Sequence, residues 1–139
     1  MKTEDRNEIT NLINLYALAV DTQRWELFNQ VFTADAEADF GGGAHWYDLE
    51  TFMRDFAVFH DPFDATQHSM SNLQLVANGE NANVLTYGHW RLLREVEGGN
   101  LWEGAGWYDD RLVRTDDGWR IKHRVCRVLW WAGNNLVRE

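Results

Sequence analysis

The hydrophobic period of this chain changes once, near its sole proline, Pro62. Before Pro62, apolar residues recur every three or four positions, as they do along one face of an α-helix. After Pro62 the period is two, which is the pattern of half-buried β-strands. The 139-residue chain is therefore expected to form one α+β domain, residues 1–139, in which helices precede a sheet.

Three helices and a short strand are expected in the first half. Residues 3–21 place Ile9, Leu12 and Tyr16 at helical spacing, with acidic residues in the first turn, where the helix dipole favours them. A second, short helix is expected over 22–32, and a strand over 34–43 that runs into three glycines. A third helix over 47–63 cannot continue past Pro62, because proline lacks the N–H donor that a helix interior requires.

Four long strands are expected after the proline, over residues 66–77, 81–96, 101–114 and 118–131. The segments between them contain "NGE", "EGGN" and "TDDG", which are residue types that favour tight turns. Such short connections make the four strands antiparallel neighbours. Helices packed on one face of a strongly curved, mostly antiparallel sheet enclose a pocket, so we expect a cone-shaped fold.

Charge and cysteine content exclude several classes of protein. The formal net charge of −9 disfavours nucleic acids and acidic membranes as partners, because both are bound through clustered Lys and Arg. No segment is apolar and long enough for a membrane span or a leader, so we expect a cytoplasmic protein. The single cysteine, Cys126, excludes an intrachain disulfide. The eight tryptophans suit an apolar cavity, an interface or a curved sheet.

Three sequence segments, in this order along the chain, resemble sequences of the SnoaL-like branch of the nuclear transport factor 2-like superfamily. They are "LYALAVDTQRWELFNQVFTADA" at 15–36, "TQHSMSN" at 66–72 and "GWYDDRLVRTDDGWRIKHR" at 106–124. The resemblance covers nearly the whole chain and implies a cystatin-like cone around a hydrophobic pocket. The family includes lyases, dehydratases, isomerases and binding proteins without activity, so the fold alone does not give the function.

The resemblance also suggests site residues. Asp21 followed by His68 is similar to the Asp–His pair of scytalone dehydratase, the bile-acid dehydratases and hexachlorocyclohexane dehydrochlorinase. Tyr16 stands where the bile-acid dehydratases carry a tyrosine, and Arg124 resembles the arginine of the dehydrochlorinase by its spacing from His68. The dehydrochlorinase has a lysine in place of Tyr16, which argues against halide departure assisted by a cation here.

His68 and Asp21 have two interpretations. A neutral imidazole can take a proton and return it near neutral pH, and a carboxylate on its other nitrogen fixes the tautomer and stabilises the imidazolium. Alternatively, Asp21 caps the helix at Trp25 and His68 has only a local partner. In one continuous helix Tyr16 and Asp21 would point roughly 140° apart. They can face one pocket only if the helix ends near Val20.

Tyr16, Arg124 and the candidate pocket-lining residues also have two interpretations each. Tyr16 either donates a hydrogen bond to a substrate oxygen or belongs to the core. Strand alternation places Arg124 on the face of Arg120 and Lys122, where it binds a substrate anion only if that face points inward. Candidate pocket-lining residues, each of which could instead be core, are Trp25, Phe40, Trp46, Met70, Trp90, Trp107 and Tyr108.

The leading hypothesis is a cofactor-independent lyase of the dehydratase type, or an isomerase, that acts on a small hydrophobic, cyclic or aromatic substrate. The alternative is a non-catalytic protein that binds a hydrophobic small molecule. The five histidines show no metal-binding spacing, so no metal is expected. The apolar "VLWWAGN" segment near the end favours a homo-oligomer, either a dimer or a trimer.

Overall fold

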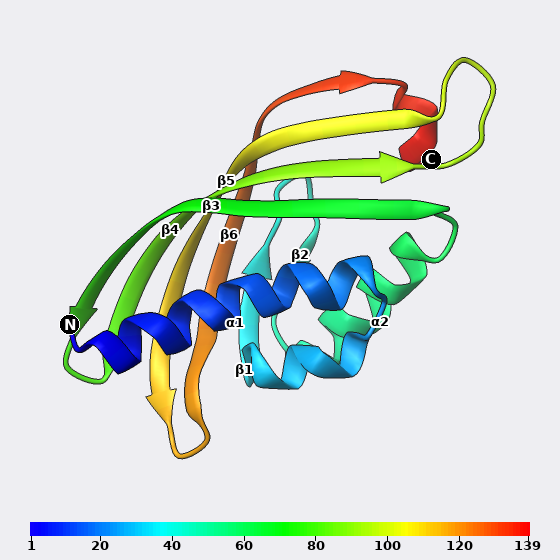
Figure 1. Cartoon of the computed structure of the whole chain (residues 1–139). Coiled ribbons are helices and arrows are strands. Elements are labelled where there is room, and N and C mark those ends of the chain that lie inside the picture. Colours follow the sequence, from blue (N-terminus) through cyan, green and yellow to red (C-terminus); the bar gives the residue numbers. More distant parts are fainter.

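The computed structural model describes residues 1–139 and places every strand in one sheet, in the order β2-β1-β6-β5-β4-β3 (Figure 1). The strands are β1 (Phe32–Asp39), β2 (His45–Trp46), β3 (Ala65–Asn78), β4 (Asn81–Leu93), β5 (Leu101–Thr115) and β6 (Gly118–Gly133). The helices are α1 (Thr3–Asp21) and α2 (Leu49–His60), with two 3₁₀ turns, η1 (Trp25–Gln30) and η2 (Asn135–Arg138).

The predicted order of elements is confirmed, with three differences. The second helix is only the 3₁₀ turn η1, and the short segments β2 and η2 have no counterpart in the sequence pattern. The third difference is that β1 pairs with β6 in parallel, with Phe32 opposite Ile121 and Glu37 opposite His123. This pairing joins residues far apart in the chain, which local periodicity cannot reveal.

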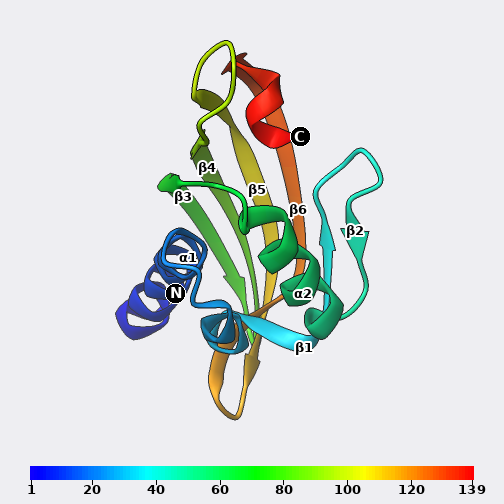
Figure 2. The same ribbon diagram turned by 90° about the vertical axis from the view of Figure 1, so that its right-hand side faces the viewer.

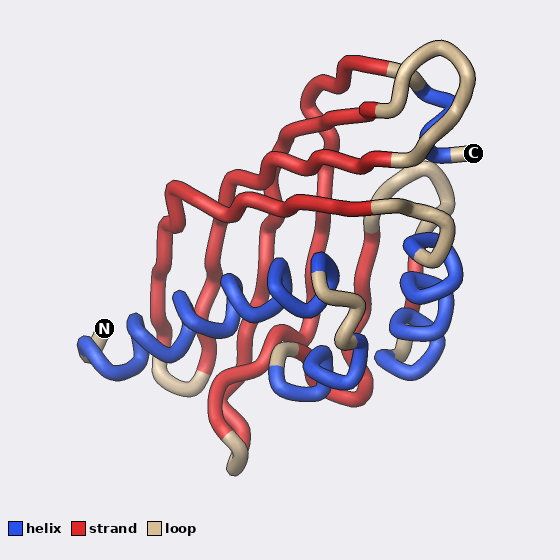
Figure 3. The backbone as a smooth tube through the Cα atoms, turned by 45° about the vertical axis from the view of Figure 1, so that its right-hand side comes forward, coloured by secondary structure: helices blue, strands red, loops and turns tan.

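The sheet is strongly curved, and the long strands bend about halfway along their length (Figure 3). The pairing of β3 with β4 is irregular between Ser71 and Gln74, where Asn72 has a positive φ of 57°. The pairing of β5 with β6 is irregular between Ala105 and Gly106. Such bulges insert an unpaired residue and increase the local twist. Both helices lie against the concave side (Figure 2), which confirms the predicted α+β cone. The sheet itself is open, with β2 at one edge and β3 at the other.

A second irregularity in β6 corrects the predicted facing of Arg124. Arg111 pairs with His123 whereas Leu112 pairs with Ile121, so Lys122 is an extra residue. The bulge shifts the alternation by one position, and Arg124 therefore lies on the buried inner face with Ile121 rather than with Lys122.

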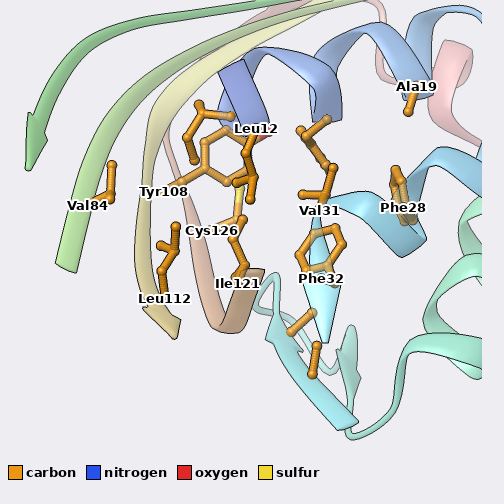
Figure 4. Packing of buried hydrophobic residues seen from close by; sticks show 14 of the residues in the cluster. Leu12, Ala19, Phe28, Val31, Phe32, Val84, Tyr108, Leu112, Ile121 and Cys126 are labelled. Atoms are coloured by element: carbon orange, nitrogen blue, oxygen red, sulfur yellow. The ribbon is translucent and has the colours of Figure 1, made fainter. Parts of the chain in front are cut away.

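The main core lies between the helices and the inner face of the sheet. In Figure 4, Leu12 of α1 packs over Tyr108 and Cys126 of the sheet, and Val31 and Phe32 lie beside Ile121. Full burial of side chains of this size stabilises the fold by about 1.5–3 kcal/mol each. The core is unusually aromatic, since the rings of Tyr16, Phe28, Phe32, Phe52 and Phe56 all belong to it.

The end of β6 leaves a large apolar surface uncovered. Trp130 and Trp131 are 46% and 53% exposed, and Leu129 beside them is 64% exposed. Association of subunits through this segment stays a prediction. No helix in the structure is both long enough and apolar enough to cross a bilayer.

Candidate functional site

Asp21 and His68 meet through the tertiary fold. Asp21 is the last residue of α1, and its Oδ1 lies 2.7 Å from Nδ1 of His68. The other oxygen, Oδ2, accepts a hydrogen bond of 2.8 Å from the backbone N–H of His68, and Thr66 Oγ1 donates to Oδ1 at 2.8 Å. The alternative role of Asp21 as a cap is absent, because η1 begins after Arg24 without a side-chain cap.

The His68 ring opens onto a cavity of about 310 Å³. Because Asp21 occupies Nδ1, the nitrogen that remains for a ligand is Nε2. Asp21 itself does not line the cavity. The wall is mostly apolar and consists of Tyr16, Phe40, Gly41, Ala44, Trp46, Asp55, Phe56, Phe59, His60, His68, Trp90, Leu92, Trp102, Tyr108, Cys126, Val128 and Arg138.

Glycines on the inner face of the sheet let large rings lie flat against it. A Cβ at Gly88 would lie 2.8 Å from ring atoms of both Trp90 and Tyr108, and one at Gly104 would lie 2.5 Å from the ring of Trp102. Two of these rings are also joined by a hydrogen bond, in which Trp90 Nε1 donates to the Tyr108 hydroxyl at 2.7 Å. A glycine inside a strand often marks such a close approach.

Two cavity tyrosines are protonated hydrogen-bond donors. Burial raises the pKa of both Tyr16 and Tyr108. The buried Arg124 guanidinium works in the opposite direction, and it lies 4.3 Å and 4.1 Å from the two ring centres. A phenol that stays neutral can donate a hydrogen bond to an oxygen that develops negative charge. Tyr16 also lies near His68, and their ring centres are 6.4 Å apart.

Arg124 lies on the buried inner face but does not line the cavity, so its position does not support the role of a substrate-binding cation. Its Nε and Nη2 donate to the two carboxylate oxygens of Asp110, each at 2.8 Å, and both side chains are 0% exposed. This bidentate geometry is that of a charged pair. Burial raises the pKa of Asp110 and Arg124 lowers it. We infer that the pair stays ionised, because its two partners neutralise each other.

His60 is a second histidine of the cavity that was not recognised as a site residue from the sequence. It ends α2, and its Nδ1 lies 2.7 Å from the carbonyl oxygen of Phe56. A carbonyl only accepts, so Nδ1 carries the hydrogen and Nε2 keeps a free lone pair. Its ring centre is 6.3 Å from that of His68. The available signal was its spacing from Phe52 and Phe56, which places it on the buried face of α2.

Stability should fall in mild acid because of His60. Burial lowers the pKa of His60 to about 4, whereas an unfolded histidine titrates near 6.5. Between these values the unfolded chain binds a proton that the folded chain does not, so stability rises with pH. Titration of His60 should therefore lower the free energy of unfolding by about 2 kcal/mol when the pH falls from 7 to 5. Urea unfolding at both pH values would measure it.

The matched variant for this measurement is His60→Asn, whose amide can still donate to the Phe56 carbonyl but does not titrate. Its loss of stability between pH 7 and pH 5 should be smaller by about the same 2 kcal/mol. An identical pH dependence in the two proteins would show that His60 does not titrate abnormally.

Four of the predicted lining residues, Phe40, Trp46, Trp90 and Tyr108, do line the cavity, and three lie elsewhere. Trp25 packs against Phe28, Phe56 and His60. Met70 packs against the main core. Trp107 alternates with Tyr108 along β5 and therefore lies on the outer face, where it is 39% exposed.

No group of three or more His, Cys, Asp or Glu side chains has an arrangement that could hold a metal ion. Burial raises the pKa of the Cys126 thiol to about 12. A thiol that stays protonated is a poor nucleophile, so Cys126 contributes an apolar surface to the cavity.

Similarity to known proteins agrees with this fold. Residues 1–125 match the model of the SnoaL-like domain. An uncharacterised protein of Mycobacterium tuberculosis is 30% identical over 129 residues, which cover 87% of this chain and 83% of that protein. Because that relative is uncharacterised, it suggests no activity for this chain.

Two solved structures show the same architecture at low sequence identity. A candidate scytalone dehydratase from Novosphingobium aromaticivorans aligns with a TM-score of 0.83 and 19% identity, over 94% of this chain and 87% of that one. A type 2 hexachlorocyclohexane dehydrochlorinase aligns with a TM-score of 0.81 and 21% identity, over 91% and 86%. With its cystatin-like, nuclear transport factor 2-like fold, the chain belongs to the SnoaL-like domain family.

Proposed function

We propose that this protein is a cofactor-independent lyase of the dehydratase type, or an isomerase, that acts on a small hydrophobic, cyclic or aromatic substrate. The observation that carries the proposal is the hydrogen bond of 2.7 Å between Asp21 and His68 at the wall of an apolar cavity. An imidazole oriented in this way is a general base that needs no further group to move a proton. The similarity to a candidate dehydratase and a dehydrochlorinase supports elimination chemistry.

In the elimination, Nε2 of His68 takes a proton from a carbon atom of the substrate. The electron pair of that C–H bond forms the new double bond, and the bond from the neighbouring carbon to the leaving oxygen breaks. Asp21 stabilises the imidazolium that forms. His68 then returns the proton to the leaving hydroxide, so that water leaves and the ring is neutral again. In an isomerisation the same proton returns to another carbon.

Tyr16 would stabilise the negative charge that develops on a substrate oxygen. Its phenol stays protonated because it is buried, and it lines the same cavity as His68. A hydrogen bond from this hydroxyl to a substrate carbonyl would stabilise an enolate as charge moves onto the oxygen. Arg124 would contribute only through the Tyr16 and Tyr108 rings, which its guanidinium contacts.

The test is a screen of the wild-type protein against cyclic and aromatic hydroxy compounds, with mass spectrometry to detect loss of water and NMR to detect moved double bonds. His68→Ala serves as the inactive control for every hit. Binding without turnover, equal in wild type and variant, would favour the non-catalytic ligand-binding protein. Turnover that survives His68→Ala would exclude the proposed mechanism.

A further inference from the structure

One arginine, Arg138, lines the cavity. Arg138 belongs to η2, which contacts β4 and β5. This short turn is firmly held, because Val137 is 0% exposed in a small cluster with Leu92 and Trp102. Asn134 fixes its start, since the side-chain amide donates to the carbonyls of Glu97 and Gly99. Arg138 is therefore carried to the cavity by a packed element.

The Arg138 guanidinium has no anionic partner. Its carbon Cζ lies 4.6 Å from the centre of a Trp102 ring, and the residue lines the cavity. The Arg138 guanidinium forms no hydrogen bond and no ion pair, whereas the guanidinium groups of Arg114, Arg124 and Arg127 each bind a carboxylate. Arg138 as a whole is exposed, but the packing around its guanidinium still removes some solvent and lowers its pKa.

Trp102 presents a second donor without an acceptor. Its Nε1 is buried and makes no hydrogen bond, although an indole N–H is a donor and buried donors are normally paired. Four buried side-chain atoms lack a partner in this structure: Thr33 Oγ1, Thr86 Oγ1, Trp102 Nε1 and Arg124 Nη1. Trp102 is the only one of these four residues that lines the cavity.

The protein does not supply the missing acceptor. Asp55 is the only carboxylate residue in the cavity wall. Its Oδ2 accepts a hydrogen bond of 2.8 Å from Trp46 Nε1, and its Oδ1 lies 3.5 Å from Nε of Arg54. The Asp55 carboxylate thus contacts Trp46 and Arg54 and forms no ion pair with Arg138. No side chain of the protein therefore accepts a hydrogen bond from the Arg138 guanidinium or from Trp102 Nε1.

We infer that the ligand of this cavity is a hydrophobic carboxylic acid, whose carboxylate is bound by Arg138 and Trp102 while its ring system reaches the His68 end. A guanidinium matches a planar carboxylate with two parallel N–H donors. Trp102 and Tyr108 lie on the same face of β5, six residues apart, which corresponds to at most about 20 Å of strand. This inference takes from the proposed function only that the cavity is the substrate site.

The test compares 2-naphthoate with 2-naphthamide, a neutral analogue of nearly the same shape, by isothermal titration calorimetry. The wild type should bind the acid at least about tenfold more tightly than the amide, because a hydrogen bond to a charged group contributes more than one to a neutral group. Arg138→Gln should abolish this preference, and Arg138→Lys should keep part of it. Trp102→Phe, which keeps a ring but removes the N–H, should weaken binding of the acid several-fold.

The matched control is Arg6→Gln, which makes the same change in net charge at an exposed position of α1. It should leave the preference for the acid unchanged. The inference would be overturned if the wild type bound the acid and the amide equally, if it bound neither, or if Arg138→Gln kept the preference. His68→Ala should also keep the preference, so a protein that binds acids but converts none would contradict the proposed reaction and not the carboxylate site.

Discussion

Replacing His68 with alanine should lower the turnover of an identified substrate by about 10²–10⁴-fold, which is the usual contribution of a general acid–base group. The variant loses the only imidazole of the cavity that a carboxylate assists, since the second cavity histidine, His60, donates to a backbone carbonyl instead. KM should change little, because the removed group acts on the transition state. Steady-state kinetics of both proteins would measure the effect.

A suitable control is His89→Ala. His89 also forms a short contact with a carboxylate, 2.7 Å from Glu103, but it lies on the opposite face of β4 from the cavity residue Trp90. Its removal should leave turnover within about twofold, since surface substitutions of this kind rarely perturb a fold. Equal losses in the two variants would show that His68 acts through stability alone.

Asp21→Asn tests the carboxylate separately. The carboxylate accepts from both the His68 backbone N–H and the ring nitrogen Nδ1. An amide has a single acceptor oxygen, so it cannot serve these two donors and Thr66 in the same way. It also cannot stabilise an imidazolium. We expect turnover to fall by at least about 10², with the free energy of unfolding changed less than in Asp21→Ala.

Replacing Asp110 with alanine should lower the free energy of unfolding by about 3–5 kcal/mol, because it leaves the Arg124 cation buried without a counter-charge. Both side chains are 0% exposed, so water cannot replace the lost carboxylate. The tyrosine rings at 4.3 Å and 4.1 Å offer only a weaker attraction to the cation. Urea unfolding at pH 7, followed by tryptophan fluorescence, would measure the change.

The control for this prediction is an exposed ion pair of the same sheet. Asp35 lies 3.4 Å from Lys122, and the two side chains are 69% and 56% exposed. Asp35→Ala should cost no more than about 1 kcal/mol, since exposed pairs are screened by solvent. The double variant Asp110→Leu with Arg124→Met should recover much of the lost stability. Equal effects of Asp35→Ala and Asp110→Ala would contradict a role for burial.

The sequence predicted those parts of the fold that depend on neighbours in the chain. Helical spacing fixed α1 with its correct end at Asp21, and turn residues between alternating segments fixed the antiparallel order of β3 to β6. The order of three sequence segments also carried the family resemblance. The periodicity and turn signals each lie within a few tens of residues, where propensity and period act directly.

The candidate site was only partly predictable. The pairing of Asp21 with His68 came from the family resemblance, because nothing in the local sequence brings two residues from α1 and β3 together. The grouping of Arg124 with Arg120 and Lys122 on one strand face was wrong, since a single bulge at Lys122 reverses strand alternation without a mark in the sequence. His60 resembled an ordinary buried residue of a helix.

What the sequence by itself determined is the order of the long helices and strands and the family, because periodicity, turns and charge are local properties of the chain. Only the tertiary structure decided which side chains share the cavity, and that Arg124 binds Asp110 whereas Arg138 binds no carboxylate. The reason is physical: a cavity and a pairing of charges depend on distances between residues that the curvature of the sheet sets, and that curvature arises from bulges and close ring packing over glycines.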